Sequence, residues 1–228
     1  MLDEGDVHVW AVPFMPCRYD LEFLYRVLSP GEQSEVKRYV FDKDRENAVI
    51  SRGLLRLLLG HYLNADPKQL QILRTKLGKP YLVSLRENAL FFSVSHSETR
   101  AIYGITRAGR IGVDIEYLAK DFDGCEIAGQ FFTEEENATL EMTPQEYKRR
   151  VFFRYWTLKE AYLKGVGTGL SMGLNSFRLI PVRDEEMYRI CHNDGVPGTW
   201  TLRCVQPWSD YIMSVAVEGD GWDLKFFN

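Results

Sequence analysis

The sequence predicts an α+β protein made of two subdomains of similar plan. Each half of the 228-residue chain shows the same order of patterns, namely a strand, a short helix, a long helix and further strands. Hydrophobic residues make up 45% of the chain, which is enough for a sizeable core. We therefore expect an N-terminal subdomain at residues 1–107 and a C-terminal one at residues 108–228, with a ligand in the cleft between them.

The first half begins with a strand and continues with helices. Val7–Val12 alternates as a strand does, and Ser29-Pro30-Gly31-Glu32 has the pattern of a capping box that opens a short helix. A long helix is expected from about Asp44 to about Leu63 because apolar residues recur on one face. Leu90–Val94 and Arg100–Thr106 are then expected to be strands on either side of a turn at residues 95–98.

The second half follows the same order. Ile111–Glu116 is expected to be a strand, and Thr133-Glu134-Glu135-Glu136 is a second capping box. Thr143-Pro144-Gln145-Glu146 is a third, and it opens a long helix that the following glycines end near Lys164. The further strands that we expect are Phe177–Val182, Thr199–Val205 and Tyr211–Val217.

Composition excludes several classes of protein. The formal net charge of −4 and the pI near 5.7 argue against a general nucleic-acid binder. The four cysteines form no C-x-x-C pair, so we expect reduced thiols in a cytoplasmic protein; they are Cys17, Cys125, Cys191 and Cys204. The acidic start of the chain is followed by no long apolar segment, so neither a signal peptide nor a membrane helix is expected.

Two acidic residues stand out on the strand Ile111–Glu116. Asp114 and Glu116 lie two apart, and residues i and i+2 of a strand point to the same face. Two carboxylates on one face repel each other and are costly to bury, which favours a divalent cation between them. The alternative, a solvent-facing strand with Val113 and Ile115 pointing inward, fits the pattern equally well.

A stripe on the long second-half helix adds a third carboxylate. Phe152, Trp156, Glu160 and Lys164 are each four residues apart and share one helical face. Glu160 and Lys164 alone would be an ordinary surface pair, but the aromatic end of the stripe should face the core. The charged end is therefore expected at the rim of a cleft. Three carboxylates without cysteine or histidine nearby in the sequence suit Mg²⁺ and bound phosphates rather than zinc.

Several basic or hydroxyl residues are weaker candidates for an anion site. His96 lies between Ser95 and Ser97, whose hydroxyls could hold a phosphate, although a histidine in a turn is usually structural. Lys76-Leu77-Gly78-Lys79-Pro80 is a basic turn that could equally be a solvated loop. A basic stripe on the first long helix is either an ordinary surface or an anion-facing wall, and it consists of Arg45, Arg52 and Arg56.

Together these segments resemble the 4′-phosphopantetheinyl transferases of the surfactin-synthetase-activating (Sfp) type. Gly112-Val113-Asp114-Ile115-Glu116 and Phe153-Arg154-Tyr155-Trp156-Thr157-Leu158-Lys159-Glu160-Ala161-Tyr162-Leu163-Lys164 are similar to the signature pair of that family. Gly78-Lys79-Pro80, Phe92-Ser93-Val94-Ser95-His96-Ser97 and Arg52-Gly53-Leu54-Leu55-Arg56 are similar to three further motifs. The matches run in the expected order from about residue 38 to 175.

The resemblance implies a fold and a reaction. It implies a monomer of two subdomains related by pseudo-two-fold symmetry, each a small, mainly antiparallel sheet packed with helices. Coenzyme A would lie between a coenzyme-binding N-terminal half and a catalytic, Mg²⁺-binding C-terminal half. Its phosphopantetheine arm would pass to a serine of an acyl or peptidyl carrier protein of fatty-acid, polyketide or nonribosomal-peptide synthesis, releasing adenosine 3′,5′-bisphosphate. The alternatives are a catalytically silent binding protein and a Mg²⁺-dependent hydrolase of nucleotide pyrophosphates.

The resemblance also implies roles for individual residues. Asp114, Glu116 and Glu160 would hold Mg²⁺ on the pyrophosphate. Glu160 would also assist deprotonation of the carrier serine, and Lys164 would stabilise the leaving phosphate. Contacts to coenzyme A would come from Arg74, Lys79, Ser95 and His96.

One region departs from the family pattern. Lysines that often bind the 3′-phosphate of coenzyme A are replaced by Glu32 and Glu35. Asn47 and Ala48 also stand where some members have arginine and threonine. A substitute phosphate ligand is expected among four alternatives, namely Lys37, Arg38, Arg45 or Arg52.

A partner surface is expected just after the acidic strand. The stretch Tyr117–Phe132 mixes apolar residues with few charges, and part of it is expected to receive the apolar docking helix of a carrier protein. Charge reversal at Lys120 would test an electrostatic contribution to docking, because it should then change the apparent KM for the carrier. The alternative is that these residues pack the second subdomain; they are Leu118, Phe122, Ile127, Phe131 and Phe132.

Overall fold

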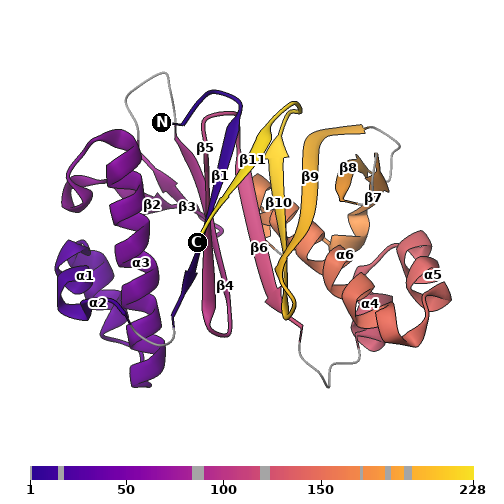
Figure 1. The fold of residues 1–228 in the computed structure, drawn as a ribbon, viewed down its shortest axis with the longest axis horizontal. Helices are drawn as coiled ribbons and strands as arrows, with labels where there is room; N and C mark the ends of the chain where they lie inside the picture. The colour runs from indigo at the N-terminus through magenta and orange to yellow at the C-terminus, as the bar shows by residue number, and fades with distance from the viewer. Residues whose placement is uncertain are drawn as a thin grey trace.

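The chain folds into four layers in the order helix, sheet, sheet, helix (Figure 1). The structure is a computed structural model that describes residues 2–14, 18–83, 90–118, 124–169, 172–182, 186–192 and 197–228. One apolar cluster lies between the two sheets, and one lies between each sheet and its helices. The predicted α+β class is confirmed.

The first sheet has the strand order β11-β1-β5-β4. Strand β1 pairs antiparallel with β5, and β5 pairs antiparallel with β4. The bounds of these strands are Asp6–Pro13 for β1, Phe91–Ser97 for β4, Arg100–Thr106 for β5 and Asp223–Phe227 for β11. Three helices cover the outer face, and a two-stranded ribbon lies beside them: α1 (Leu21–Val27), α2 (Pro30–Val36), α3 (Asp42–Leu63), β2 (Ile72–Arg74) and β3 (Pro80–Leu82).

The second sheet has the strand order β6-β10-β9-β8-β7, and all its neighbours are antiparallel. Its strands are β6 (Ile111–Tyr117), β7 (Phe177–Pro181), β8 (Met187–His192), β9 (Pro197–Trp208) and β10 (Tyr211–Glu218). Its outer face is covered by α4 (Cys125–Phe131), α5 (Glu134–Met142) and α6 (Gln145–Val166). Figure 1 shows these helices on the opposite side of the molecule from α1–α3.

The chain returns to the first sheet at its end. Strand β11 runs parallel to β1, with Val9 opposite Phe226, so the last residues of the chain extend the sheet formed by the N-terminal half. Lys225 fixes this strand because its ammonium lies 2.6 Å from Asp6 Oδ2. The division at residues 107 and 108 stays a prediction, and β11 crosses it.

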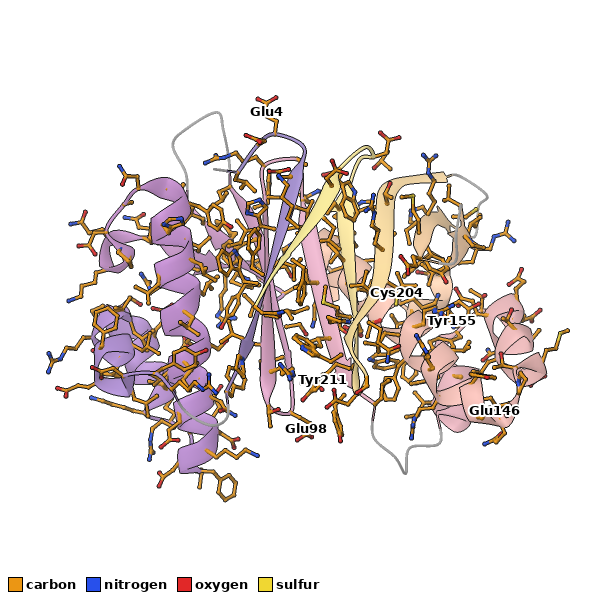
Figure 2. All side chains as sticks on the ribbon, in the orientation of Figure 1. Glu4, Glu98, Glu146, Tyr155, Cys204 and Tyr211 are labelled. Carbon is orange, nitrogen blue, oxygen red and sulfur yellow. The ribbon has the colours of Figure 1, made fainter. Side chains whose placement is uncertain are left out.

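The predicted turn at residues 95–98 is wrong. Ser95, His96 and Ser97 belong to strand β4, and Ser95 lies opposite Ile102 of β5. The turn is tighter and is formed at Glu98, whose φ of 50° is in the left-handed region. Figure 2 shows Glu98 beside Tyr211, whose hydroxyl accepts a hydrogen bond of 3.4 Å from the Thr99 N–H.

The capping boxes were predicted with mixed success. The boxes at Ser29 and Thr133 are both present. The third is wrong, because Pro144 is the N-cap of α6 and the Thr143 hydroxyl donates to the Thr139 carbonyl of the preceding helix. Two α-helices and four strands were not expected from the sequence, namely α1, α4, β2, β3, β8 and β11.

Cys191 and Cys204 are free, buried thiols. Cys17 and the side chain of Cys125 lie outside the described residues. Among the described residues, no helix is both long enough and apolar enough to span a membrane.

Candidate active site

The acidic strand β6 and helix α6 cross at two glycines. A Cβ atom on Gly112 would lie 1.9 Å from the Ala161 carbonyl oxygen and 2.3 Å from the Gly165 nitrogen. Only a residue without a side chain permits this approach. Since Gly112, Asp114 and Glu116 share one face of β6, that face is covered by α6, and Val113 and Ile115 lie in the core between the sheets. The solvent-facing alternative for the two acids is therefore wrong.

Asp114 and Lys164 form an ion pair at this crossing. Asp114 is only 3% exposed, and its Oδ1 atom lies 2.6 Å from Lys164 Nζ. The Ser95 hydroxyl donates to the same oxygen over 2.9 Å and accepts from Lys164 over 2.8 Å. Three elements, β4, β6 and α6, thus meet at one carboxylate. The other oxygen, Oδ2, is buried and has no hydrogen-bond partner in the described part of the chain.

Glu116 is held by a serine from the neighbouring sheet. The Ser97 hydroxyl donates to Glu116 Oε2 over 2.9 Å and accepts from the Tyr117 N–H over 3.1 Å. Burial, and after it the negative charges of Asp114 and Glu160, together raise the pKa of Glu116 to about 7. The carboxylate is thus destabilised as an anion by its two acidic neighbours.

Glu160 faces the same centre from helix α6. It is half-buried, and burial is the first cause that raises its pKa, followed by the charge of Asp114. Within the described ranges it makes no hydrogen bond or ion pair. The stripe on α6 runs as expected, because Phe152 is buried and Trp156 lines a groove that also contains Glu116.

The donor set fits a hard cation, although no formed centre is visible. No three His, Cys, Asp or Glu side chains among the described residues are arranged as a metal cluster. Lys164 pairs with Oδ1 of Asp114, but the buried Oδ2 has no hydrogen-bond partner among the described residues, and a buried oxygen without one is costly, so Oδ2 is open to a cation. Glu116 and Glu160 add further carboxylate oxygens. Burial and the negative charge of Asp114 raise the pKa of both groups, so a cation near them would be favourable. Oxygen ligands of this kind are those that Mg²⁺ prefers.

Lys79 joins the two halves beneath this centre. Its ammonium donates to the Ile111 carbonyl over 3.2 Å and to the Gly165 carbonyl over 2.5 Å. Gly165 lies in the last turn of α6, where a cation is favoured by the helix dipole. Burial, and after it the positive charge of Arg110, together lower the pKa of Lys79 to about 8. A cavity of about 210 Å³ lies beside it and reaches Lys164.

A larger cavity of about 790 Å³ lies against the first subdomain. Arg52 of α3, Arg74 of β2 and His96 of β4 line it. Partial burial lowers the pKa of His96, and the charge of Lys164 lowers it further. Arg74 donates to the Gly78 carbonyl over 3.1 Å. Arg45 does not line the described cavity; it pairs with Asp42 and donates to the Tyr39 carbonyl.

An apolar groove of about 320 Å³ opens on the other side of Glu116. Ile127, Phe152 and Trp156 line it, together with Ser97 of β4. Leu118 and Phe131 are partly buried against the second core, and Phe132 is 4% exposed within it. Phe122 and Lys120 lie outside the described residues. Part of the expected partner surface therefore packs against the core of the second half. For Phe132 this is the alternative given above.

Two features that hold the site were not expected from the sequence, although Ser95 was predicted to contact coenzyme A. Ser93, Ser95 and Ser97 alternate along β4, and Ser93 accepts from the Val113 N–H over 3.1 Å. Their spacing of two residues would have placed all three hydroxyls on one face if the segment had been assigned to a strand. The second is a buried ion pair of 2.8 Å between Lys159 and Glu136, residues that lie 23 apart (159 − 136). It ties α6 to α5 next to Glu160, and no local pattern reveals it.

Comparisons with known proteins show what the chain is similar to. The sequence model of the 4′-phosphopantetheinyl transferase superfamily matches residues 110–216, and that of the 4′-phosphopantetheinyl transferase N-terminal region matches residues 13–104. The chain is 33% identical over 225 residues to the 4′-phosphopantetheinyl transferase HetI of Nostoc sp., covering 98% of this chain and 92% of that protein. It is 31% identical over 210 residues to a phosphopantetheinyl transferase of Thraustochytrium sp., covering 84% and 70%.

Proposed function

Since the chain belongs to the 4′-phosphopantetheinyl transferase superfamily, we propose that it transfers the phosphopantetheine arm of coenzyme A to a serine of an apo carrier protein. The products are the holo carrier and adenosine 3′,5′-bisphosphate. The observation that carries this proposal is the cluster in which Lys164, Asp114 and Ser95 meet between the two halves. Lys164 of this cluster lines the smaller cavity, and Glu116, which lies two residues from Asp114 on β6, lines the apolar groove.

The proposed metal ligands are Asp114, Glu116 and Glu160. Bound there, Mg²⁺ would neutralise negative charge on the pyrophosphate of coenzyme A. The support is the buried, unpartnered Oδ2 of Asp114 and the mutual repulsion of the three carboxylates. Ser97 orients Glu116 and Ser95 orients Asp114, so two of the three carboxylates are fixed by hydroxyls from β4.

Lys164 and Glu160 are assigned to the transfer itself. One turn of α6 separates them, so a cation and a base face the same space. Lys164 would stabilise the phosphate that leaves with the nucleotide, as a fixed cation does for a developing anion. Glu160 would take the proton of the carrier serine, and its lack of a hydrogen-bond partner in the described chain leaves its oxygens available.

Coenzyme A is assigned to the two cavities that border β4. The smaller one holds Lys79 and Lys164, and the larger one holds Arg74 and His96. Both are lined by Pro80 and Val94, so they adjoin each other. A total of this size suits a nucleotide cofactor. Ser95, which follows the lining residue Val94 on β4, contacts Asp114 and Lys164.

The carrier protein is assigned to the groove at Ile127, Phe152 and Trp156. This groove begins at Glu116, so a serine presented there would lie next to the carboxylates. Its lining is mainly apolar, which suits the apolar face of a docking helix. A monomeric state and a cytoplasmic location complete the proposal, and light scattering at the chain mass of 26.5 kDa tests the former.

Mass spectrometry of an apo carrier protein tests this function directly. Incubation with the chain, coenzyme A and Mg²⁺ should add the mass of phosphopantetheine to the carrier serine. Two controls, Asp114→Ala and chelation of Mg²⁺, should each remove most of the product. A carrier of unchanged mass, with coenzyme A either intact or hydrolysed, would favour a silent binding protein or a pyrophosphate hydrolase. A panel of apo carriers would then identify the pathway.

A further inference from the structure

Arg52, which lines the larger cavity beside β4, and its buried neighbour Arg56 are both paired with glutamates of α2. Arg52 Nη2 lies 2.9 Å from Glu35 Oε2, and Arg52 Nη1 donates to the Glu32 carbonyl over 3.4 Å. Arg56 is 1% exposed and pairs with Glu32 Oε2 over 2.6 Å. It also donates to the carbonyls of Pro67 and Leu70. The two arginines of α3 that face this side are thus engaged by residues of the protein itself.

The N-terminus of helix α2, at the same cavity, is likewise occupied by a carboxylate of the protein. The Ser29 N–H donates to Glu32 Oε2 over 2.8 Å, and the Ser29 hydroxyl accepts from the Glu32 N–H. This capping box places the protein's own carboxylate at the start of the helix. Glu32 therefore serves both the helix cap and Arg56, and Glu35 serves Arg52.

The balance of charges in the cavity wall is unfavourable for a phosphate. Among the described residues that line it, Glu35 is paired with Arg52, and Glu32 is paired with Arg56 behind the wall, so both carboxylates and both guanidinium groups are already engaged. This leaves Asp44 against Arg74, which donates to the Gly78 carbonyl, and the imidazole of His96. A phosphate monoester carries a charge of about −1.5 to −2 at neutral pH and needs cations or free N–H donors to compensate it. To bind one, Arg52 would have to leave Glu35, whose carboxylate would then face the phosphate.

We propose that this cavity does not recognise the 3′-phosphate of the donor, and that Glu35 is the residue that prevents it. The inference rests on the proposed function and deepens it, because it defines the donor class. Coenzyme A and 3′-dephospho-coenzyme A are then donors of similar efficiency. With the latter, the serine oxygen forms a bond to the phosphorus of the phosphopantetheine arm, and the P–O bond to the nucleotide phosphate breaks. The serine proton passes to the base, and AMP leaves in place of adenosine 3′,5′-bisphosphate.

The test compares kcat/KM for the two donors with one apo carrier protein and Mg²⁺. The carrier mass and the released nucleotide are both measured. The expected result is a ratio within about tenfold, since one good charge-assisted contact to the 3′-phosphate would alone give about tenfold or more. A larger preference for coenzyme A overturns the inference while leaving the proposed function intact. No transfer from either donor overturns the proposed function, and this inference with it.

Variants of Glu35 test its role. Glu35→Lys should raise the preference for coenzyme A over dephospho-coenzyme A by about tenfold or more, because it frees Arg52 and adds a cation. Glu35→Gln, which frees Arg52 without reversing the charge, should raise it less. Glu46→Lys is the matched control, because it makes the same change on exposed α3 surface outside the cavity lining. Equal ratios in wild type and both Glu35 variants would overturn the assignment of Glu35.

Discussion

Lys164 and Asp114, which lie 50 residues apart, are joined by an ion pair of 2.6 Å. The pair links the last turn of α6 to the middle of β6, and Ser95 of the first sheet contacts both residues. A single carboxylate therefore connects the two sheets and helix α6. Because Asp114 is buried, loss of its partners leaves an uncompensated charge in the interior.

Lys164→Ala should lower kcat by about 10²-fold, as removal of other fixed electrostatic stabilisers does. KM for coenzyme A should change much less, because the lysine is assigned to the phosphate that leaves. Initial rates at varied coenzyme A measure both constants. Lys148→Ala, near the start of the same helix, is the matched control and should behave as wild type. An effect confined to KM would contradict the role given to Lys164.

Ser97→Ala should weaken Mg²⁺ binding by about 10-fold or more, which is typical when a group that orients a metal ligand is lost. The reason is that the Ser97 hydroxyl fixes both Glu116 Oε2 and the Tyr117 N–H. Isothermal titration calorimetry with Mg²⁺ gives the affinity without relying on turnover. Ser97→Thr keeps the hydroxyl and should restore most of it.

Ser93→Ala is the control for the row of serines on β4. It removes a hydroxyl that accepts from the Val113 N–H, and it does not contact a carboxylate of the site. This variant should lose stability by about 1 kcal/mol and keep its affinity for Mg²⁺. Equal losses of Mg²⁺ affinity in the Ser93 and Ser97 variants would show that the serines only hold β4 against β6 and that Ser97 does not orient a metal ligand.

Gly112→Ala should destabilise the protein by about 3 kcal/mol, the upper range for overpacking. The added Cβ would lie 1.9 Å from the Ala161 carbonyl oxygen, so β6 and α6 must separate. Urea denaturation measures the loss. Gly129→Ala in α4 is the control, because its Cβ would meet nothing within 4 Å. That change should be neutral or stabilising by up to about 1 kcal/mol. Similar stabilities of the two variants would refute the tight crossing.

Because the pKa of Lys79 is lowered in the folded protein, the free energy of unfolding should depend on pH. Its folded-state pKa, lowered to about 8 by burial and by Arg110, lies below the value of about 10.4 for an unfolded lysine. Between pH 8 and 10 the unfolded chain therefore binds more protons, and the free energy of unfolding rises with pH. Relative to Lys79→Met, wild type should gain up to about 1 kcal/mol per pH unit in this window. Urea denaturation at pH 7, 8, 9 and 10 checks this; a difference that does not vary with pH would contradict it.

Local patterns predicted the elements whose signals are strong over many residues. The helix expected from Asp44 to Leu63 is observed at Asp42–Leu63, and the strand Arg100–Thr106 was predicted with its observed bounds. The acidic strand and the stripe on α6 were also correct, because each depends on a repeated period. What failed depends on distant partners. Ser95 to Ser97 were assigned to a turn because they are polar, yet pairing with β5 keeps them in a strand.

The site was predictable in its residue types and less so in its charges. The sequence indicated an anion-facing wall of arginines, but it could not show that Glu35 and Glu32 fold onto Arg52 and Arg56. These pairs join different helices, so no spacing rule reveals them. For the same reason the parallel pairing of β11 with β1 was missed, because its stability depends on contacts with Asp6, some 219 residues away.

A crystal structure with coenzyme A and Mg²⁺ tests the central claim most directly. The predicted result is one ion with a carboxylate oxygen from each of Asp114, Glu116 and Glu160 at about 2.1 Å, the usual distance for Mg²⁺. Lys164 should then contact the pyrophosphate. An ion bound without Glu160, with that side chain directed into solvent, would contradict the proposed site.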